Sequence, residues 1–444
     1  MNIANTVRID PTRRSGTELR VVGDRVSRLW NAANYLCRQG FIAKEGVPTG
    51  SSLQELMKGT PEYRQLPSDV AQETLNKLSE AWKSYFKLRA KWSEAPNKNQ
   101  KPGLPKYRKD RKSGKRPFDL IPVKHPRSYA IDAKDISLVL PSDRRPGQKP
   151  VNRQRLFIPY RGRVRHIGKM GRAEVIWDRV RRRWYFSWFV KAADAKVSGD
   201  KCAAIDLGVR MLDSLSIEGR EMSLHFDGHD VLKDRDFFGR EIARKQACIA
   251  GTRGGDPEKC PSSRAISLRH RKRKGRLEHA LRAIAKVVAE TCADAGVGTV
   301  FLGWPKGILG DRDYGSKWNG RIHGLWSFDK SLAILECAFR AVGIIPVRVG
   351  ERGTSSTCPT CSSKNVVRHP RWALRCLDCG EMIHADQAGS RNILRQNKPS
   401  VCWDGAEAAP RTVTRRWTLH CWEDRSANPR RFARDGVPEF LKVA

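Results

Sequence analysis

Apolar residues recur at intervals of three and four residues in two stretches of the first hundred positions, which predicts two amphipathic helices. In the first stretch Asp24 is the expected N-cap, and the apolar face runs from Val26 to Leu36 before a stop at Gly40. The second stretch begins after Ser68 and has four apolar residues on one face: Leu75, Leu78, Trp82 and Phe86. A short strand precedes both at residues 6–9, so we expect a small helical module after an N-terminal strand.

The pattern then changes twice along the chain. Residues 101–190 show short runs typical of β-strands, and the runs at 174–177 and 184–190 are expected to form a hairpin through residues 179–183. From about residue 200, apolar strands alternate with helical patterns, which indicates a mixed sheet covered by helices. These elements are a strand at 202–206, a returning strand at 214–219, a basic helix pair within 231–296, a strand at 299–302, a helix at 332–342 and a strand at 344–349.

The chain is strongly basic, with 85 Lys and Arg residues against 47 Asp and Glu residues in 444 positions, a net charge of +38. Residues 101–190 hold 25 of the basic residues and 7 of the acidic ones, with tyrosines and tryptophans interleaved. Such a charge favours a polyanionic partner and argues against an ordinary metabolic enzyme. Because we find no run of 18 apolar residues and no signal-peptide pattern, we expect nucleic acid as the partner and no membrane.

Four of the twelve cysteines form two Cys-x-x-Cys pairs separated by fourteen residues: Cys358, Cys361, Cys376 and Cys379. Two such turns aim four thiolates at one point, which predicts a closed tetrahedral zinc site. A closed site leaves no open coordination position, so the zinc is expected to be structural. The other cysteines show no pairing pattern and are expected to be reduced thiols.

Two acidic residues stand at positions suited to catalysis. Asp206 ends a buried strand, and Asp386 begins a helix just after the second cysteine pair. A carboxylate at such a strand end is costly unless it is paired or binds a metal, and paired carboxylates hold the Mg²⁺ or Mn²⁺ ions that cut phosphodiesters. Taken alone, Asp206 is equally well a turn residue and Asp386 a helix N-cap.

The order of these motifs resembles the TnpB family of transposon-encoded RNA-guided nucleases and the compact type V CRISPR effectors related to them. The resemblance rests on Ile205-Asp206-Leu-Gly, on Thr354-Ser355 before the first cysteine pair, on Cys376-Leu-Asp-Cys-Gly, and on Ala385-Asp386-Gln-Ala followed by Arg391-Asn392-Ile. It extends more weakly to Trp30-Asn31 and Arg183-Trp-Tyr, and it covers most of residues 1–395.

The resemblance implies a multidomain α+β protein. It implies a β-barrel wedge domain (1–21 and 100–198) with a helical recognition insert (22–99), followed by an α/β RNase H-like, RuvC-type domain (199–355 and 382–398) with a zinc-ribbon insert (356–381). Residues 399–444 remain a basic C-terminal tail, which either packs on the nuclease domain or binds RNA. In this family pattern Asp206 and Asp386 match the first and third catalytic acids.

The family's middle acid has no match, because Gly303 and Trp304 stand where it is expected. The nearest acids are Asp311, Asp313 and Glu336, any of which could serve as a displaced third acid. Two carboxylates give a charge of −2 instead of −3 toward two divalent cations, so the sequence favours target binding with weak or absent cleavage. The alternatives are an active endonuclease with a displaced acid, and a zinc-ribbon protein that binds nucleic acid without a guide.

The implied cofactors are structural Zn²⁺, Mg²⁺ or Mn²⁺ if the site is catalytic, and a guide RNA. The implied partners are guide RNA and target double-stranded DNA with a short flanking motif, with a homodimer on one RNA as a further expectation. The expected location is the prokaryotic cytoplasm, on the nucleoid when the protein is bound to DNA. The expected nucleic-acid contacts are Arg161, Arg163, Arg165, Arg181, Arg182, Arg183, Arg269, Arg271, Lys272, Arg273 and Lys274.

Overall fold

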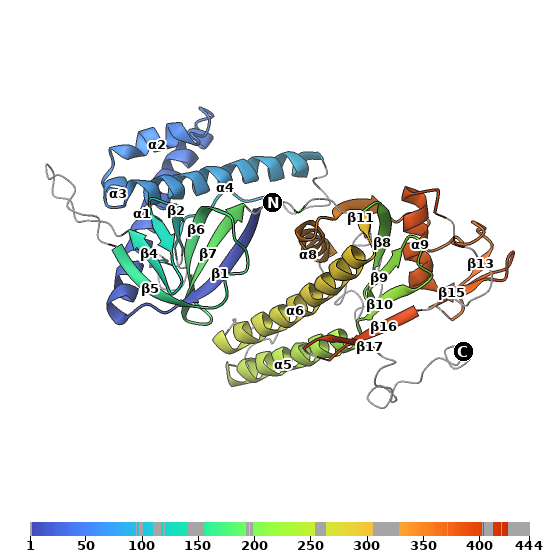
Figure 1. Ribbon diagram of the computed structural model, residues 1–444. Coiled ribbons are helices and arrows are strands. Elements are labelled where there is room, and N and C mark those ends of the chain that lie inside the picture. The colour runs from blue at the N-terminus through green and yellow to red at the C-terminus, as the bar shows by residue number, and fades with distance from the viewer. Residues whose placement is uncertain are drawn as a thin grey trace. The chain divides into compact units, whose positions relative to one another are not determined.

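The computed structural model (Figure 1) divides into two compact units, Met1–Ala193 and Asp194–Ala444. The structure describes residues 2–94, 96, 101–109, 117–118, 120–139, 155–191, 195, 199–253, 263–304, 328–370, 372–401, 403, 412–418 and 420–424.

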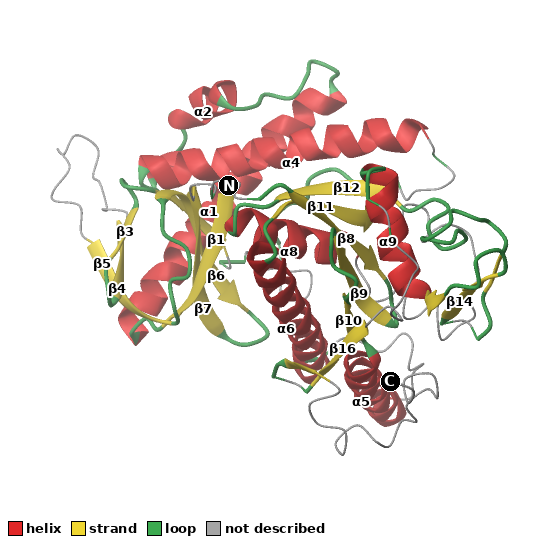
Figure 2. Ribbon diagram, turned by 45° about the vertical axis from the view of Figure 1, so that its right-hand side comes forward, coloured by secondary structure: helices red, strands yellow, loops and turns green. Residues whose placement is uncertain are grey.

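The first unit is built on a seven-stranded sheet that forms a half-barrel, which confirms the expected barrel-type domain (Figure 2). Its strands follow the order β2-β6-β7-β1-β5-β4-β3, and all of its pairings are antiparallel. The expected hairpin is β6–β7, in which Trp177 lies opposite Trp184. The strands are β1 (Asn2–Ile9), β2 (Leu120–Lys124), β3 (Tyr129–Ile131), β4 (Asp135–Val139), β5 (Arg155–Arg161), β6 (Lys169–Asp178) and β7 (Arg183–Lys191).

Four helices follow β1 in this unit: α1 (Arg13–Ile42), α2 (Ser51–Lys58), α3 (Pro61–Arg64) and α4 (Ser68–Glu94). The expected start of the first helix was wrong, because Thr12 and not Asp24 is its N-cap and accepts a hydrogen bond from the backbone N–H of Ser15. Asp24 lies inside α1 and pairs with Arg28 one turn later. The start of α4 agrees with the sequence expectation.

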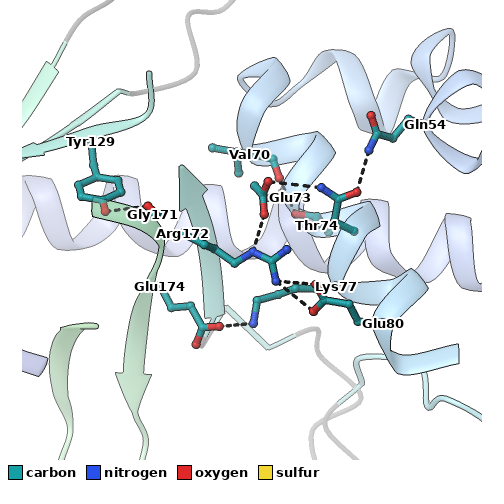
Figure 3. Close-up of polar contacts among 11 residues, drawn as sticks. Gln54, Val70, Glu73, Thr74, Lys77, Glu80, Tyr129, Gly171, Arg172 and Glu174 are labelled. Carbon is teal, nitrogen blue, oxygen red and sulfur yellow. Dashed lines mark hydrogen bonds and ion pairs between the residues drawn. The ribbon is translucent and has the colours of Figure 1, made fainter. Parts of the chain in front are cut away.

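Helix α4 is joined to the sheet by a cluster of charged side chains (Figure 3). Arg172 on β6 contacts Glu73 through Nε at 2.6 Å and Glu80 through Nη1 at 2.8 Å. Lys77 contacts Glu174 on the same strand. Glu73 is buried, so its pairing with Arg172 offsets a desolvation cost that an unpaired carboxylate would carry. These ion pairs hold helix α4 on strand β6 of the half-barrel sheet.

The second unit contains a seven-stranded mixed sheet with the order β12-β11-β8-β9-β10-β16-β17. Strands β8, β11 and β12 are parallel, whereas β9 is antiparallel to both β8 and β10. The strands are β8 (Lys201–Leu207), β9 (Met211–Ile217), β10 (Ser223–Asp227), β11 (Val297–Trp304), β12 (Ile345–Gly350), β16 (Thr412–Trp417) and β17 (Trp422–Asp424).

Helices cover both faces of this sheet. Its helices are α5 (His229–Arg253), α6 (Arg264–Asp294), α8 (Phe328–Ala341) and α9 (Ala385–Asn397). Ile205 on β8 packs in one core with Leu281 of α6 and Leu335 of α8. Ala204, the preceding residue, packs in a second core with Ile393 of α9. Alternate β8 side chains point to opposite faces, so Asp206 faces α9.

The described part of the C-terminal tail belongs to this unit. Strand β16 pairs in parallel with β10, and Trp417 and Trp422 are buried in the α6 core. Trp422 Nε1 donates to the backbone carbonyl of Ala280 at 3.1 Å, and Arg416 Nε contacts Asp230 at 2.6 Å. Of the two alternatives for the tail, packing on the domain holds for residues 412–418 and 420–424, which lie in the second unit.

A small three-stranded sheet precedes α9: β13 (Val366–Val367), β14 (Ala373–Cys376) and β15 (Met382–His384). Its last strand ends at His384, and α9 begins at the next residue. Within the described ranges, no helix is both long and apolar enough to cross a membrane.

Candidate active site and zinc-binding site

Three acidic residues are gathered at one edge of the second unit's sheet. Asp206 is the penultimate residue of β8, Glu351 directly follows β12, and Asp386 is in the first turn of α9. Strands β8, β11 and β12 are parallel, so their carboxyl ends meet at this edge. Helix α9 lies close to it, because a methyl group added at Gly389 would overlap the Asp206 carboxylate.

The electrostatics confirm that these acids are close together. Burial raises the pKa of Asp206 well above its usual range, and the neighbouring carboxylates of Glu351 and Asp386 raise it further. Burial also raises the pKa of Glu351 to about 7, although the backbone N–H of Leu207 hydrogen-bonds to its carboxylate and favours the ionised form. Carboxylates that destabilise one another in this way bind a cation favourably.

Glu351 is the residue that sequence reasoning missed. Gly303, which stands where the family's middle acid is expected, has no side chain, and a methyl group there would overlap the Glu351 carboxylate. The adjacent strand β12 therefore brings an acid to the place that β11 leaves empty. The available signal was an acid directly after the strand at 344–349, in the motif Gly350-Glu351-Arg-Gly before Thr354.

The sequence suggested three candidates for a displaced third acid: Asp311, Asp313 and Glu336. None of them is found beside Asp206 in the part of the chain that the structure describes. Glu336 is on α8 and is paired with Arg348 of β12. Asp311 and Asp313 fall among residues 305–327, which the structure does not describe. The acid that the structure brings beside Asp206 and Asp386 is Glu351.

The position of Asp386 is fixed by His384, which caps α9. His384 Nδ1 accepts a hydrogen bond from the backbone N–H of Asp386 at 3.2 Å. Burial lowers the pKa of His384; Asp386 partly opposes this and Arg368 adds to it, so the pKa lies below its usual value and the neutral ring can accept this bond. The 3.8 Å separation between His384 Nδ1 and Asp386 Oδ2 is accordingly not an ion pair.

An arginine from the small sheet also acts on the acids. The positive charge of Arg368, the residue after β13, lowers the pKa of Asp206 and thus partly opposes the effect of the other carboxylates. Asp213 on β9 also raises the pKa of Asp206, so the charge of Arg368 opposes three neighbouring carboxylates there. This combination suits a site that holds metal ions on one side and a phosphate on the other.

The four cysteines of the two pairs converge as the sequence predicted. Cys358 Sγ lies 3.7 Å from Cys379 Sγ, and Cys361 Sγ lies 3.5 Å from Cys376 Sγ. Tetrahedral zinc with bonds of about 2.3 Å needs sulfur atoms about 3.8 Å apart, so the four thiols fit this metal. Backbone hydrogen bonding, chiefly from Cys379, lowers the pKa of Cys376 to about 7, which favours the thiolate.

The carboxylates are less tightly gathered than these thiols. Among the described residues, the four cysteines are the group of potential metal ligands whose atoms all lie within 4.8 Å of one another. Glu351 and Asp386 are close enough to raise the pKa of Asp206, but the three carboxylates are more widely spaced than the thiols.

The basic residues expected to contact nucleic acid fall in both units. In the first unit Arg161 is 77% exposed and pairs with Asp10, and Arg181 Nη1 lies 3.3 Å from the hydroxyl of Tyr185. The remaining residues of this group are exposed: Arg163 and Arg165 follow β5, Arg182 lies in the turn between β6 and β7, and Arg183 begins β7.

In the second unit, the cluster at the start of α6 is partly used within the protein. Arg269 pairs with Glu241 of α5, and Arg273 Nη2 lies 3.2 Å from His270 Nδ1. Lys272 lies over the ring of Phe238 at 5.7 Å while its charge stays exposed. Arg271 and Lys274 are also exposed.

Two family models match parts of this chain. A family model for a probable transposase, OrfB_IS605, matches residues 185–309, and the Cas12f1-like TNB domain model matches residues 328–393. The first match includes Asp206 and Gly303, and the second includes Glu351, the four cysteines and Asp386.

Relatives match over nearly the whole chain. The TnpB-like protein ORF457 of Acidianus two-tailed virus is 29% identical over 416 residues, which is 88% of this chain and 86% of the relative. A solved Cas12f1-sgRNA-target DNA complex is similar with a TM-score of 0.58 and 15% identity, covering 86% of this chain and 83% of that one. The mini-RNA-guided endonuclease CRISPR-Cas_phi3 matches with a TM-score of 0.47 and 11% identity, covering 89% and 92%. The chain is therefore TnpB-like in sequence over most of its length and has the fold of a compact type V effector.

Proposed function

We propose that this protein is an RNA-guided, metal-dependent DNA endonuclease that cuts with Asp206, Glu351 and Asp386. The observation that carries the proposal is the convergence of three carboxylates at one sheet edge, where Glu351 fills the space beside Gly303, α9 packs closely on Asp206, and Glu351 and Asp386 both raise the pKa of Asp206. Glu351 restores the charge of −3 that the sequence lacked at Gly303. Weak or absent cleavage was expected only because two carboxylates would give a charge of −2 toward the metal ions.

The side chains at this edge fit a divalent cation. Glu351 Oε1 is buried and has no hydrogen-bond partner among the described residues, so an oxygen ligand is available for a metal. Burial raises the pKa of both Asp206 and Glu351, and the neighbouring carboxylates raise that of Asp206 further, so a bound cation would stabilise their ionised forms. Divalent ions held here would lower the pKa of an attacking water and stabilise the leaving oxygen.

The surrounding residues have distinct tasks in this proposal. His384 holds the backbone of Asp386 and so fixes where that carboxylate points. Arg368 supplies a positive charge beside the acids, and a guanidinium at that place suits a non-bridging oxygen of the scissile phosphate. Gly389 lets α9 approach Asp206 closely enough for both acids to share one site.

Guide RNA and target DNA enter the proposal through charge and resemblance. The net charge of +38 gives the protein affinity for nucleic-acid backbones but no sequence selectivity, which base pairing with a guide would supply. The solved Cas12f1 structure with the same fold is a complex with guide RNA and target DNA. A flanking DNA motif and a homodimer on one RNA stay predictions.

The test begins with the RNA that copurifies with the protein. Sequencing should give one dominant species with a variable end, and a random mixture would favour unguided zinc-ribbon binding. The complex is then incubated with matched DNA and Mg²⁺ or Mn²⁺. We expect double-strand breaks that Asp206→Ala abolishes; tight, guide-dependent binding without breaks would instead favour the non-cutting alternative.

A further inference from the structure

A basic segment of the first unit is anchored by its backbone along helix α1. Trp30 Nε1 donates to the carbonyl of Lys106 at 3.1 Å, and Asn34 Nδ2 donates to the carbonyl of Pro105 at 3.0 Å. Asn31 makes two hydrogen bonds to Arg108, accepting from its N–H at 2.7 Å and donating to its carbonyl at 3.1 Å. We call residues 101–109 the basic strap.

The anchor is itself rigid. Asn34 is fully buried, and its Oδ1 accepts a hydrogen bond from Trp82 Nε1 of α4 at 3.1 Å. Arg38 donates to the Pro105 carbonyl at 2.6 Å, one helical turn further along α1. Buried polar side chains normally form hydrogen bonds within their own helix or core. Here they bind the backbone of residues 105 and 106 instead.

Part of the basic strap is exposed, whereas Leu104 packs on the core and Arg108 lies over the Trp30 ring at 4.2 Å. Lys106 and Lys109 are exposed, and Tyr107 keeps 39% of its surface exposed while Arg38 lies over its ring at 4.5 Å. Tyr35 on α1, one turn from Asn31 and Arg38, is 55% exposed. The strap contains Lys101, Lys106, Arg108 and Lys109 and no acidic residue.

We propose that the basic strap is a binding site for a single-stranded stretch of RNA, with Lys106 and Lys109 on phosphates and Tyr107 stacked against a base. The inference rests on the proposed function in that the RNA is the guide. Because the strap is pre-ordered by α1, binding does not have to order its backbone, which preserves affinity.

The combination of groups favours unpaired RNA over a duplex. An exposed ring beside cations stacks on a free base, which a paired strand does not offer. Lys106 and Lys109 are three residues apart, so their backbone positions are separated by at most about 10 Å, which allows their flexible side chains to reach neighbouring phosphates of one strand. A guide RNA is the strand that the protein must hold before any DNA arrives.

The test measures binding of a fluorescent single-stranded RNA of guide sequence to the full chain at several salt concentrations. We expect Lys106→Ala/Lys109→Ala to raise Kd about tenfold near 0.15 M salt and to reduce the slope of log K against log salt by about 1.4. The matched control, Lys44→Ala/Lys58→Ala, removes the same charge from exposed positions of the same unit and should change Kd less than twofold.

A second variant tests whether anchoring of the strap's backbone contributes to RNA binding independently of the strap's charge. Asn31→Ala removes no charge but releases Arg108, and we expect Kd to rise three- to tenfold (an order-of-magnitude figure) with the salt slope unchanged. Thermal melting identifies any variant that fails to fold. Unchanged RNA binding in both folded variants would overturn the proposal, as would a loss confined to DNA binding by the RNA-loaded protein.

The two proposals fail in different ways. If the wild type cuts matched DNA but the strap variants bind RNA as tightly as the wild type, the strap proposal fails while the endonuclease proposal stands. If wild-type protein binds RNA and cuts nothing, the endonuclease proposal fails while the RNA-binding result still decides the role of the strap.

Discussion

The carboxylate of Glu351, at the end of β12, occupies the space that a side chain at Gly303 on β11 would fill. The two positions are neighbours, because Trp304 lies opposite Gly350 in the parallel pairing of these strands. Glu351, which follows the edge strand β12, thus places its carboxylate where an acidic side chain at position 303 of β11 would lie. The absence of a side chain at Gly303 is the condition for this arrangement.

Moving the acid between the two strands tests this relationship. Gly303→Glu alone should reduce DNA cleavage at least tenfold, because the new side chain collides with Glu351. Combining it with Glu351→Gly removes the collision and returns a carboxylate to the site, so part of the cleavage should be recovered. Rates on one guide-matched DNA measure both effects. Full activity of the Gly303→Glu single variant would contradict the account.

The close approach of α9 to Asp206 gives a second prediction. Gly389→Ala places a methyl group against the Asp206 carboxylate, so it should destabilise the fold by about 1–3 kcal/mol and greatly reduce cleavage. Gly275→Ala on α6 is the matched control, since a methyl group there meets open space and should be neutral or stabilising. Thermal unfolding and cleavage rates check both variants. Equal effects of the two changes would show that crowding at Asp206 is not the cause.

A buried acid next to the site predicts a pH-dependent stability. Asp213 on β9 is 1% exposed, and burial raises its pKa to about 7. The folded state therefore disfavours the ionised form. The free energy of unfolding therefore falls as pH rises from the unfolded-state pKa of Asp213, near 4, toward its folded-state pKa of about 7. The total loss is on the order of a few kcal/mol.

Asp213→Asn should remove that cost, so the gain in melting temperature over wild type should increase between pH 5 and pH 8. Asp329→Asn, at a position whose side chain is 75% exposed, is the control and should show no such trend. A gain for Asp213→Asn that is the same at both pH values would refute the assignment.

Zinc removal should affect cutting more than RNA binding. The cysteine cluster orders the segment that carries Arg368 and leads through β15 directly into α9. Cys361→Ser/Cys376→Ser should therefore lose one equivalent of zinc and most cleavage, while RNA affinity stays within about threefold. Cys248→Ser, an exposed thiol on α5, serves as the control. Full cleavage by zinc-depleted protein would argue against this coupling.

The sequence predicted the elements well where periodicity is strong. The hairpin at 174–190, the strand that ends at Asp206 and the helix after Ser68 all agree with the structure. The start of α1 was misplaced: Thr12 caps the helix twelve residues before Asp24, and Leu19 and Val22 already belong to its buried face. A single local hydrogen bond decided that boundary, and periodicity carries no information about it.

The candidate site was predicted in part. Asp206, Asp386 and the cysteines follow from local motifs, and the structure brings each set together. Glu351 could not be assigned from the sequence, because its role depends on β12 lying beside β11, a pairing between segments more than forty residues apart. The tail strand β16 likewise depends on a distant pairing with β10, which a short basic segment does not reveal.

The most direct test of the endonuclease proposal is cleavage of guide-matched DNA by Glu351→Gln compared with Glu336→Gln, Asp311→Asn and Asp313→Asn in the presence of Mg²⁺ or Mn²⁺. The account predicts that Glu351→Gln lowers cleavage at least a hundredfold, with RNA and DNA binding unchanged, and that the other three variants cut at nearly the wild-type rate. Wild-type cleavage by Glu351→Gln, or its loss in one of the other variants alone, would contradict the account.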